Sequence, residues 1–268
     1  RRGHIDLCFS HMNPLFVVLA GPILSTRHIR TVLWRAHRTR SIITRLAYFF
    51  SWRIFVNYGL SDSRTIVTGQ MVDIDLFKSD NNWKKDDLPL FISVGRIAPI
   101  KDLITFIRAA GIMHDRGHFF KCVCICPVLA HDTTYYASLL AEVKRLSLSD
   151  IFSFSGAVPR ATLPMEYARA TAHINLCSTG ALDKAVIEAM ACGTPSVFAN
   201  KSFIPITGVF TALLQFRYGD ATSLARVLTG FMAMPRSQSA ALCSRLRATV
   251  VQHHSMESFM GHFLNLLA

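Results

Sequence analysis

The segment HINLCSTGALDKAVIEAMACGTPSVFAN, residues 173–200, decides the fold of this chain. His173 to Leu176 form a short apolar run typical of a buried strand, and Ser196 to Ala199 form a second one. Between them, Asp183 to Cys192 is almost wholly apolar or small, which predicts a buried helix. A strand, a helix and a strand in such close succession predict a right-handed crossover within a parallel sheet.

The ends of this predicted helix carry clear signals. Asp183 suits the first turn, where a carboxylate meets unpaired N–H groups and the positive end of the helix dipole. Gly193 fits a left-handed cap, and Pro195 cannot continue the helix. Ligands of parallel α/β sheets bind beyond the carboxyl ends of the strands. The sequence therefore predicts a ligand site at the loop Cys177–Leu182, which is built of small residues around Gly180.

Glu188 stands out in this unit because its neighbours other than Lys184 are apolar or small. Lys184 lies one helical turn away, so one interpretation is an exposed ion pair worth only about 0.2–0.5 kcal/mol. The other interpretation is a carboxylate that faces a ligand hydroxyl at the end of the sheet. The spacing by itself favours the exposed pair.

The stretch LDKAVIEAMACGTPSV resembles the donor-sugar motif of the retaining glycosyltransferases of group 1, the glycogen-synthase-like enzymes with the two-domain GT-B fold. Three further stretches are similar to that family and stand in the same order: VTGQMVDIDLF at 67–77, SVGRIAPIKDLITFIRAA at 93–110, and FSGAVPRATLPMEYARATAHINL at 154–176. With weaker matches before residue 67, the resemblance covers nearly the whole chain. It implies an α/β chain of GT-B type, with one doubly wound, parallel-sheet Rossmann-like domain and part of a second one.

Two basic residues follow the strand predicted at Leu90–Val94. Arg96 comes directly after Gly95, and Lys101 opens the next predicted helix. A guanidinium and an ammonium beside helix N–H groups form a suitable pocket for a diphosphate, although such a pair taken alone is more often a solvated loop charge. The resemblance to the family's G-R-x4-K element implies that both cations neutralise the leaving nucleoside diphosphate. Fixed cations of this kind make a metal unnecessary, so we expect no metal and no cofactor.

The same resemblance implies further contacts to the donor. Glu188 matches the family's second Glu, which implies an acceptor for a ribose hydroxyl. His37, at the end of a predicted strand, matches a His that contacts the donor sugar; a surface histidine beside Arg35 and Arg38 is the other interpretation. The catalytic residues implied are Arg96, Lys101, Glu188 and His37, and the donor-binding residues implied are Gly95, Arg96, Lys101, Gly180, Ala181, Leu182, Asp183 and Glu188.

The sequence departs from the family pattern at three places. Gly180 stands where the family has its first Glu, eight residues before Glu188, and Asp183 is the nearest carboxylate that could take over its contact to the sugar. Met71 replaces a Gly near the hinge, and Cys126 begins a Cys-Pro pair where the family has a Gly-rich turn.

The domain organisation follows from the pattern of elements. Residues 1–77 are predicted to be a remnant of an N-terminal, acceptor-side Rossmann-like domain, residues 78–253 the nucleotide-sugar domain, and residues 254–268 a C-terminal helix. The polar segment Phe77–Pro89 reads as the linker. The chain has 268 residues and begins with Arg, so the N-terminal domain is expected to be incomplete, since two full domains need roughly 150–200 residues each.

The net charge and the composition limit the classes of partner that the chain is expected to bind. The net charge is +12, and before residue 65 ten Arg side chains face only two acidic ones, Asp6 and Asp62. These basic residues are not interleaved with aromatics on strands, so no nucleic acid is expected, and an anionic membrane surface is the favoured partner besides a UDP- or GDP-sugar. The run Leu15–Leu24 contains Gly21 and Pro22 and is too short to span a bilayer. The expected location is cytoplasmic, peripheral at the membrane.

Three cysteines of the segment FKCVCICPV alternate along a predicted strand: Cys122, Cys124 and Cys126. They would point to one face of the sheet, unlike the C-x2-C turns that bind zinc. We expect them to be small core residues of a reducing compartment.

Three functional hypotheses remain at this point. The first is a hexosyltransferase-like enzyme that moves a sugar from a nucleotide-sugar to a hydroxyl acceptor. The second is a catalytically impaired homologue that binds a nucleotide-sugar or a partner. The third is a basic module that binds nucleic acid or a membrane.

Overall fold

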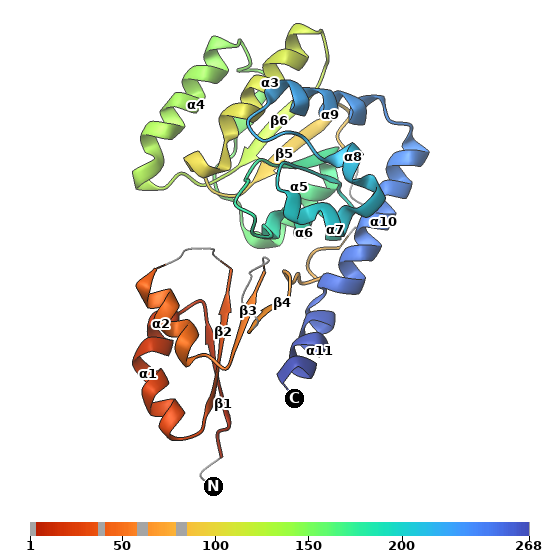
Figure 1. Cartoon of the computed structure of the whole chain (residues 1–268). Helices are drawn as coiled ribbons and strands as arrows, with labels where there is room; N and C mark the ends of the chain where they lie inside the picture. The colour runs from red at the N-terminus through yellow and green to blue at the C-terminus, as the bar shows by residue number, and fades with distance from the viewer. Residues whose placement is uncertain (1–3, 37–40, 58–63, 79–84, 268) are drawn as a thin grey trace. The chain divides into compact units, whose positions relative to one another are not determined.

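The computed structural model describes residues 4–36, 41–57, 64–78 and 85–267, and the chain folds into two compact units (Figure 1). Unit 1 consists of Arg1–Gln70 and Gly261–Ala268, and unit 2 consists of Met71–Met260. The division thus lies seven residues before the boundary predicted at 77/78, because Val72 and Phe77 are buried in the core of unit 2.

Unit 1 is built on a sheet of four parallel strands in the order β1-β2-β3-β4. The strands are Leu7–His11, Arg30–Arg35, Arg53–Val56 and Thr65–Val67, and helices α1 (Pro14–Thr26) and α2 (Ile42–Phe50) form two of the crossovers. Both helices pack against the sheet through a small core of Val17, Leu33 and Ala47. The last element, α11 (Met256–Leu267), belongs to unit 1 from Gly261 onward, where Phe263 packs on Phe9 and Phe55.

Helix α1 runs without a break through Pro22. Pro14 occupies the first turn, and the Asn13 side chain caps it by accepting a hydrogen bond from the Phe16 amide at 3.0 Å. Pro22 lies on the exposed side of the helix, so its ring removes one hydrogen bond without disturbing the packed side. On that packed side Gly21 is required, since a Cβ there would lie 2.6 Å from Cβ of Phe50 on α2.

Unit 2 is built on five parallel strands in the order β7-β6-β5-β8-β9. In chain order the strands are Leu90–Val94, Lys121–Ile125, Phe152–Phe154, Ala172–Asn175 and Ser196–Phe198. The longer helices are α3 (Leu103–Asp115), α4 (Thr133–Arg145), α5 (Leu163–Arg169), α6 (Lys184–Ala191), α9 (Ala221–Ala233) and α10 (Arg236–His254). Short helical turns, among them α7 (Ile204–Thr207) and α8 (Thr211–Leu214), join β9 to α9.

The helices of unit 2 cover both faces of its sheet (Figure 1). Helix α3 packs between α4 and α9, and α6 packs between α5 and α10. One continuous hydrophobic core fills the space around the strands. The predicted doubly wound parallel sheet is therefore confirmed, and Cys122, Cys124 and Cys126 are buried free thiols in this core, as the alternation predicted.

The strand order of unit 2 contains a switch point. From β5 the chain proceeds through β6 to β7 on one side, and β8 and β9 then lie on the other side of β5. The two crossover directions diverge between β5 and β8, and in open α/β sheets a ligand binds in the crevice beyond the carboxyl ends of such a strand pair. The loops after Val94 and after Asn175 are those that border this crevice.

None of the helices in the described part of the chain combines the length and the apolar character needed to traverse a bilayer.

Candidate functional site

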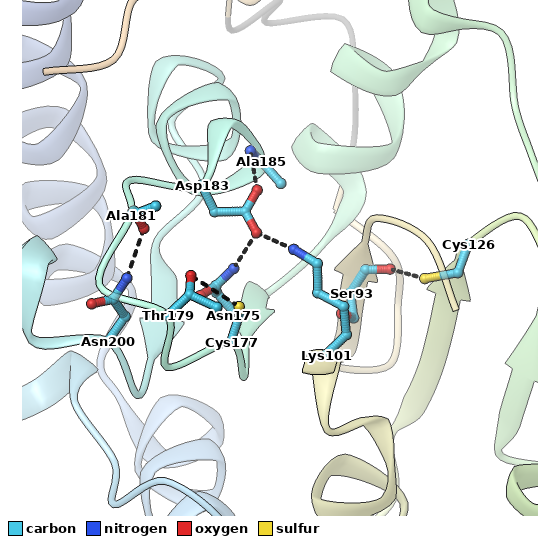
Figure 2. A network of polar contacts seen from close by, with 10 residues as sticks. All are labelled: Ser93, Lys101, Cys126, Asn175, Cys177, Thr179, Ala181, Asp183, Ala185 and Asn200. Carbon is cyan, nitrogen blue, oxygen red and sulfur yellow. Dashed lines mark hydrogen bonds and ion pairs between the residues drawn. The ribbon is translucent and has the colours of Figure 1, made fainter. Parts of the chain in front are cut away.

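The loops after β5 and β8 meet in an ion pair between Lys101 and Asp183 (Figure 2). Lys101 belongs to a 3-10 turn, Pro99–Lys101, and its side chain reaches across the switch point. Asp183 precedes the first residue of α6. Both side chains keep about a fifth of their surface accessible, 23% for Lys101 and 22% for Asp183. Two residues that are 82 positions apart thus form one polar site at the carboxyl edge of the sheet.

Asp183 has polar partners on both carboxylate oxygens. Its Oδ2 accepts a hydrogen bond from Asn175 Nδ2 at 3.0 Å in addition to the Lys101 contact, and its Oδ1 caps α6 by accepting from the Ala185 amide at 3.4 Å (Figure 2). Burial alone would raise the pKa of Asp183, but the Lys101 ammonium and Asn175 outweigh this and hold the pKa below its ordinary value. Asp183 is therefore ionised at neutral pH.

Gly95 and Arg96 lie between β5 and Lys101 in the chain. Arg96 is exposed, and no residue of the described parts of the chain pairs with its guanidinium. Gly95 lies directly beside the lysine, since a Cβ there would be 3.8 Å from Lys101 Cε. The structure corrects one detail of the prediction: Lys101 does not open a helix, because Asp102 adopts a left-handed conformation with φ of 46° and α3 begins only at Leu103.

Glu188 forms a second polar cluster, about one turn into α6. Its Oε2 accepts a hydrogen bond from the Tyr167 hydroxyl at 3.4 Å, and its Oε1 lies 3.7 Å from Arg160 Nη2. Only 12% of the Glu188 side chain is accessible, so the interpretation as an exposed pair with Lys184 is wrong. Burial raises the pKa of Glu188, and the charges of Arg160 and Lys184 partly oppose that rise.

The loop Cys177–Leu182 is held by hydrogen bonds from the segment that follows β9. Asn200 Nδ2 donates to the carbonyl of Ala181 at 2.8 Å, and Ser202 Oγ donates to the carbonyl of Gly180 at 2.7 Å. Gly180 has φ of 78°, a conformation that favours glycine. Leu182 packs half-buried against the core of unit 2, next to Asp183.

The other residues singled out from the sequence are placed as follows. His37 lies outside the described residues. Met71 is the first residue of unit 2 and is half-buried. Cys126 follows β6, is buried, and directs its thiol to the carbonyl of Ser93 at 3.6 Å (Figure 2). In the parts of the chain that the structure describes, no three or more His, Cys, Asp or Glu side chains form a group that could hold a metal ion.

Sequence reasoning missed five residues that shape the site. Asn175 ends a buried strand, which is itself a signal for a functional polar side chain at the carboxyl edge of a sheet. Arg160 and Tyr167 lie within the family-like stretch 154–176, but their meeting with Glu188 depends on how α5 packs on α6. Asn200 and Ser202 lie after β9 and give no local sign that they bind the loop of the neighbouring strand.

The fold and the site define the class of protein. Two units built on parallel sheets, with a polar site at the switch point of the second, form the architecture of GT-B glycosyltransferases, and the chain resembles solved structures of this kind. Sucrose-phosphate synthase from Thermosynechococcus elongatus matches with a TM-score of 0.81 and 16% identity, over 98% of this chain and 73% of that one. HepE from Anabaena, in complex with UDP and glucose, matches with a TM-score of 0.82 and 16% identity, over 98% and 77%.

A third structure resembles unit 2. It is the C-terminal domain of LpcC, a glycosyl transferase group 1 family protein from Francisella tularensis, with a TM-score of 0.61 and 17% identity over 69% of this chain and 99% of that domain. At the level of sequence, the family Glycosyl transferases group 1 matches residues 75–240. The chain belongs to this family, and the predicted family and GT-B fold are confirmed. A search among curated proteins found no match.

Proposed function

We propose that this chain transfers a hexose from a UDP- or GDP-sugar to a hydroxyl acceptor, with retention of the anomeric configuration. The observation that carries the proposal is the ion pair of Lys101 with Asp183 at the switch point between β5 and β8, with the exposed Arg96 in the segment between β5 and Lys101. Two cations in a segment that borders such a crevice suit the diphosphate of a nucleotide-sugar. The UDP and glucose bound in the HepE structure support a donor of this class.

In this proposal the two cations stabilise the charge that develops on the departing nucleoside diphosphate. Lys101 has three donor hydrogens, so contact with Asp183 leaves donors for phosphate oxygens. Arg96 is exposed and offers a planar pair of donors that matches a phosphate. With two cations beside the departing diphosphate, the transfer needs no metal and no cofactor.

The two carboxylates would take the hydroxyl groups of the donor. Glu188 is oriented by Tyr167 and Arg160, and we assign it to a ribose hydroxyl. Asp183 lies at the start of α6 beside the loop, and we assign it to the sugar, in place of the family's Glu that Gly180 replaces. Each carboxylate oxygen accepts two hydrogen bonds, so the present partners of Asp183 leave room for a hydroxyl.

A second candidate is a homologue that binds a nucleotide-sugar without transferring it. The Lys101–Asp183 ion pair favours this candidate, because the carboxylate cancels part of the positive charge that the diphosphate would meet. The glycine at position 180, where the family has a Glu, favours it as well.

Calorimetric titration with UDP and with GDP, followed by transfer assays with a panel of nucleotide-sugars, distinguishes these functions. Binding together with turnover supports the transferase, and His37→Ala in the same assay tests the predicted contact of His37. Binding of a nucleotide without turnover of any donor supports the second candidate. A folded protein that binds neither nucleotide contradicts both.

A further inference from the structure

Unit 1 carries an apolar surface on the outer side of its two crossover helices. On α1, the side chains of Leu15, Leu19 and Ile23 are 49%, 69% and 60% exposed, and on α2 those of Ile42, Leu46 and Phe49 are 76%, 45% and 74% exposed. Their spacing of three or four residues places each set on one face of its helix. The two helices pack against each other where Gly21 meets Phe50, so the two sets form one surface, named here the α1–α2 apolar face.

This arrangement is the reverse of an ordinary surface helix, which turns its charged residues outward. Helix α1 contains no charged residue, and α2 contains Arg45 alone. The inner sides of both helices are already occupied by the core of unit 1, where Val17, Thr44 and Ala47 are buried. The outward apolar side chains therefore do not serve the packing of unit 1, and an exposed apolar surface of this extent marks an interaction site.

Arginines lie at one end of this face. Arg27 follows the last turn of α1, Arg30 opens β2, Arg53 opens β3, and Arg64 precedes β4. Because the strands are parallel, the last three lie at one edge of the sheet, the edge at which both helices end. The ring of Trp52 lies between two of these guanidinium groups, 4.5 Å from Arg30 Cζ and 4.6 Å from Arg53 Cζ. Within the described residues of unit 1 the sole carboxylate side chain is Asp6, which pairs with His4.

We propose that the α1–α2 apolar face docks unit 1 onto an anionic lipid surface. Apolar side chains would enter the boundary between headgroups and acyl chains, while Arg27 and Arg45 and the Arg–Trp edge would meet lipid phosphates. Charge complementarity selects this occupant over a second copy of the chain, since two such faces would bring like-charged arginines together. This docking does not depend on the proposed transfer reaction.

The experiment is flotation of the purified chain with vesicles of phosphatidylglycerol and phosphatidylcholine, and with vesicles of phosphatidylcholine alone. We expect binding to the anionic vesicles at low salt, much weaker binding to the neutral ones, and release by high salt. The double variant Leu19→Ser/Phe49→Ser should reduce the partition coefficient at least tenfold. Its matched control is Phe119→Ser/Val209→Ser, which removes two side chains of unit 2 that are 79% and 90% exposed, and it should bind as the wild type does.

A second pair of variants tests the charge. Arg27→Gln/Arg45→Gln should weaken binding to anionic vesicles by about fivefold per arginine, and the control Arg116→Gln/Arg226→Gln, on exposed positions of unit 2, should not. All variants should keep the far-UV circular dichroism of the wild type, because the replaced side chains are exposed.

Equal binding of wild type and Leu19→Ser/Phe49→Ser, or no binding of the wild type to anionic vesicles, would overturn the proposal. A wild-type dimer in light scattering that the same variant dissociates, without vesicle binding, would assign the face to a second copy and also overturn it.

Discussion

At the scale of single residues, the two cations after β5 have different surroundings and should respond differently to removal. Lys101 is paired with a carboxylate that is mostly buried, whereas Arg96 is exposed and has no partner among the described residues. Removing Lys101 leaves the Asp183 carboxylate buried without the cation that offsets the free-energy cost of its burial. An unpaired, partly buried charge of this kind destabilises the folded protein. Removing Arg96 leaves nothing unpaired in the free protein.

We therefore expect Arg96→Ala to weaken binding of UDP or GDP roughly tenfold or more, with an unchanged melting temperature, since a charge-assisted contact is worth about 1.5–3 kcal/mol. Lys101→Ala should weaken binding and also lower the melting temperature, and the added change Asp183→Asn should restore much of the stability. Titration calorimetry and thermal denaturation measure the two effects. Arg116→Ala, at the other end of α3, serves as the control. Unchanged affinity in both single variants would remove these residues from the site.

Glu188 offers a prediction about pH. Its pKa is raised, so the folded protein holds this proton at a higher pH than an ordinary glutamate does. A ribose hydroxyl needs the ionised form as acceptor, so nucleotide affinity should fall as the pH is lowered through that raised pKa. Glu188→Gln should bind more weakly at neutral pH and lack this part of the pH dependence. The matched control is Glu142→Gln, which removes a carboxylate paired with Arg108 and Arg145 on unit 2. A Glu188→Gln profile identical to that of the wild type would contradict the assignment.

At the scale of elements, the loop Cys177–Leu182 depends on the segment that follows β9. The backbone carbonyls of Gly180 and Ala181 are held by Ser202 and Asn200, which follow β9. These contacts fix the loop before any ligand arrives, and preorganisation of this kind lowers the entropy cost of binding. The positive φ of Gly180 also means that a Glu restored at this position would be strained, by an amount on the order of 1 kcal/mol.

We predict that Asn200→Ala/Ser202→Ala weakens nucleotide-sugar binding by up to about tenfold, because each hydrogen bond contributes about 0.5–1.5 kcal/mol to the ordered loop. Hydrogen exchange of the 177–182 amides should become faster, while the rest of unit 2 keeps its protection. Thr249→Ala provides the control, since it removes a similar but exposed hydrogen bond within α10, to the carbonyl of Arg245. Slow exchange of the loop in the double variant would show that other contacts hold it.

At the scale of the whole molecule, unit 2 contains every described side chain of the candidate site. Its hydrophobic core runs from Val72 to Val250 without a residue from unit 1. The family match at 75–240 lies within this unit, and a solved C-terminal domain of similar fold covers a comparable part of the chain. Unit 2 thus has the core of an independent domain and contains the proposed nucleotide site.

We expect residues 71–260 produced alone to fold cooperatively and to bind UDP or GDP within about threefold of the affinity of the whole chain. Circular dichroism melts and calorimetric titration test this. The complementary change Leu33→Ala, in the core of unit 1, should destabilise unit 1 in the whole chain and leave nucleotide affinity unaltered. Loss of binding in residues 71–260 with an intact fold would mean that unit 1 contributes directly to the nucleotide site.

The amino-acid sequence by itself determined the parallel α/β fold, since the apolar runs of β5, β6, β8 and β9 and the helix signals at Asp183 and Gly193 are local properties. It also determined the family, through motifs in a fixed order. Only the tertiary structure decided which side chains meet: the ion pair of Lys101 with Asp183 spans 82 positions, and the partners of Glu188 come from the preceding turn and helix. The physical reason is that helical spacing fixes neighbours on one element, whereas contacts across a switch point depend on strand order, which no local pattern encodes.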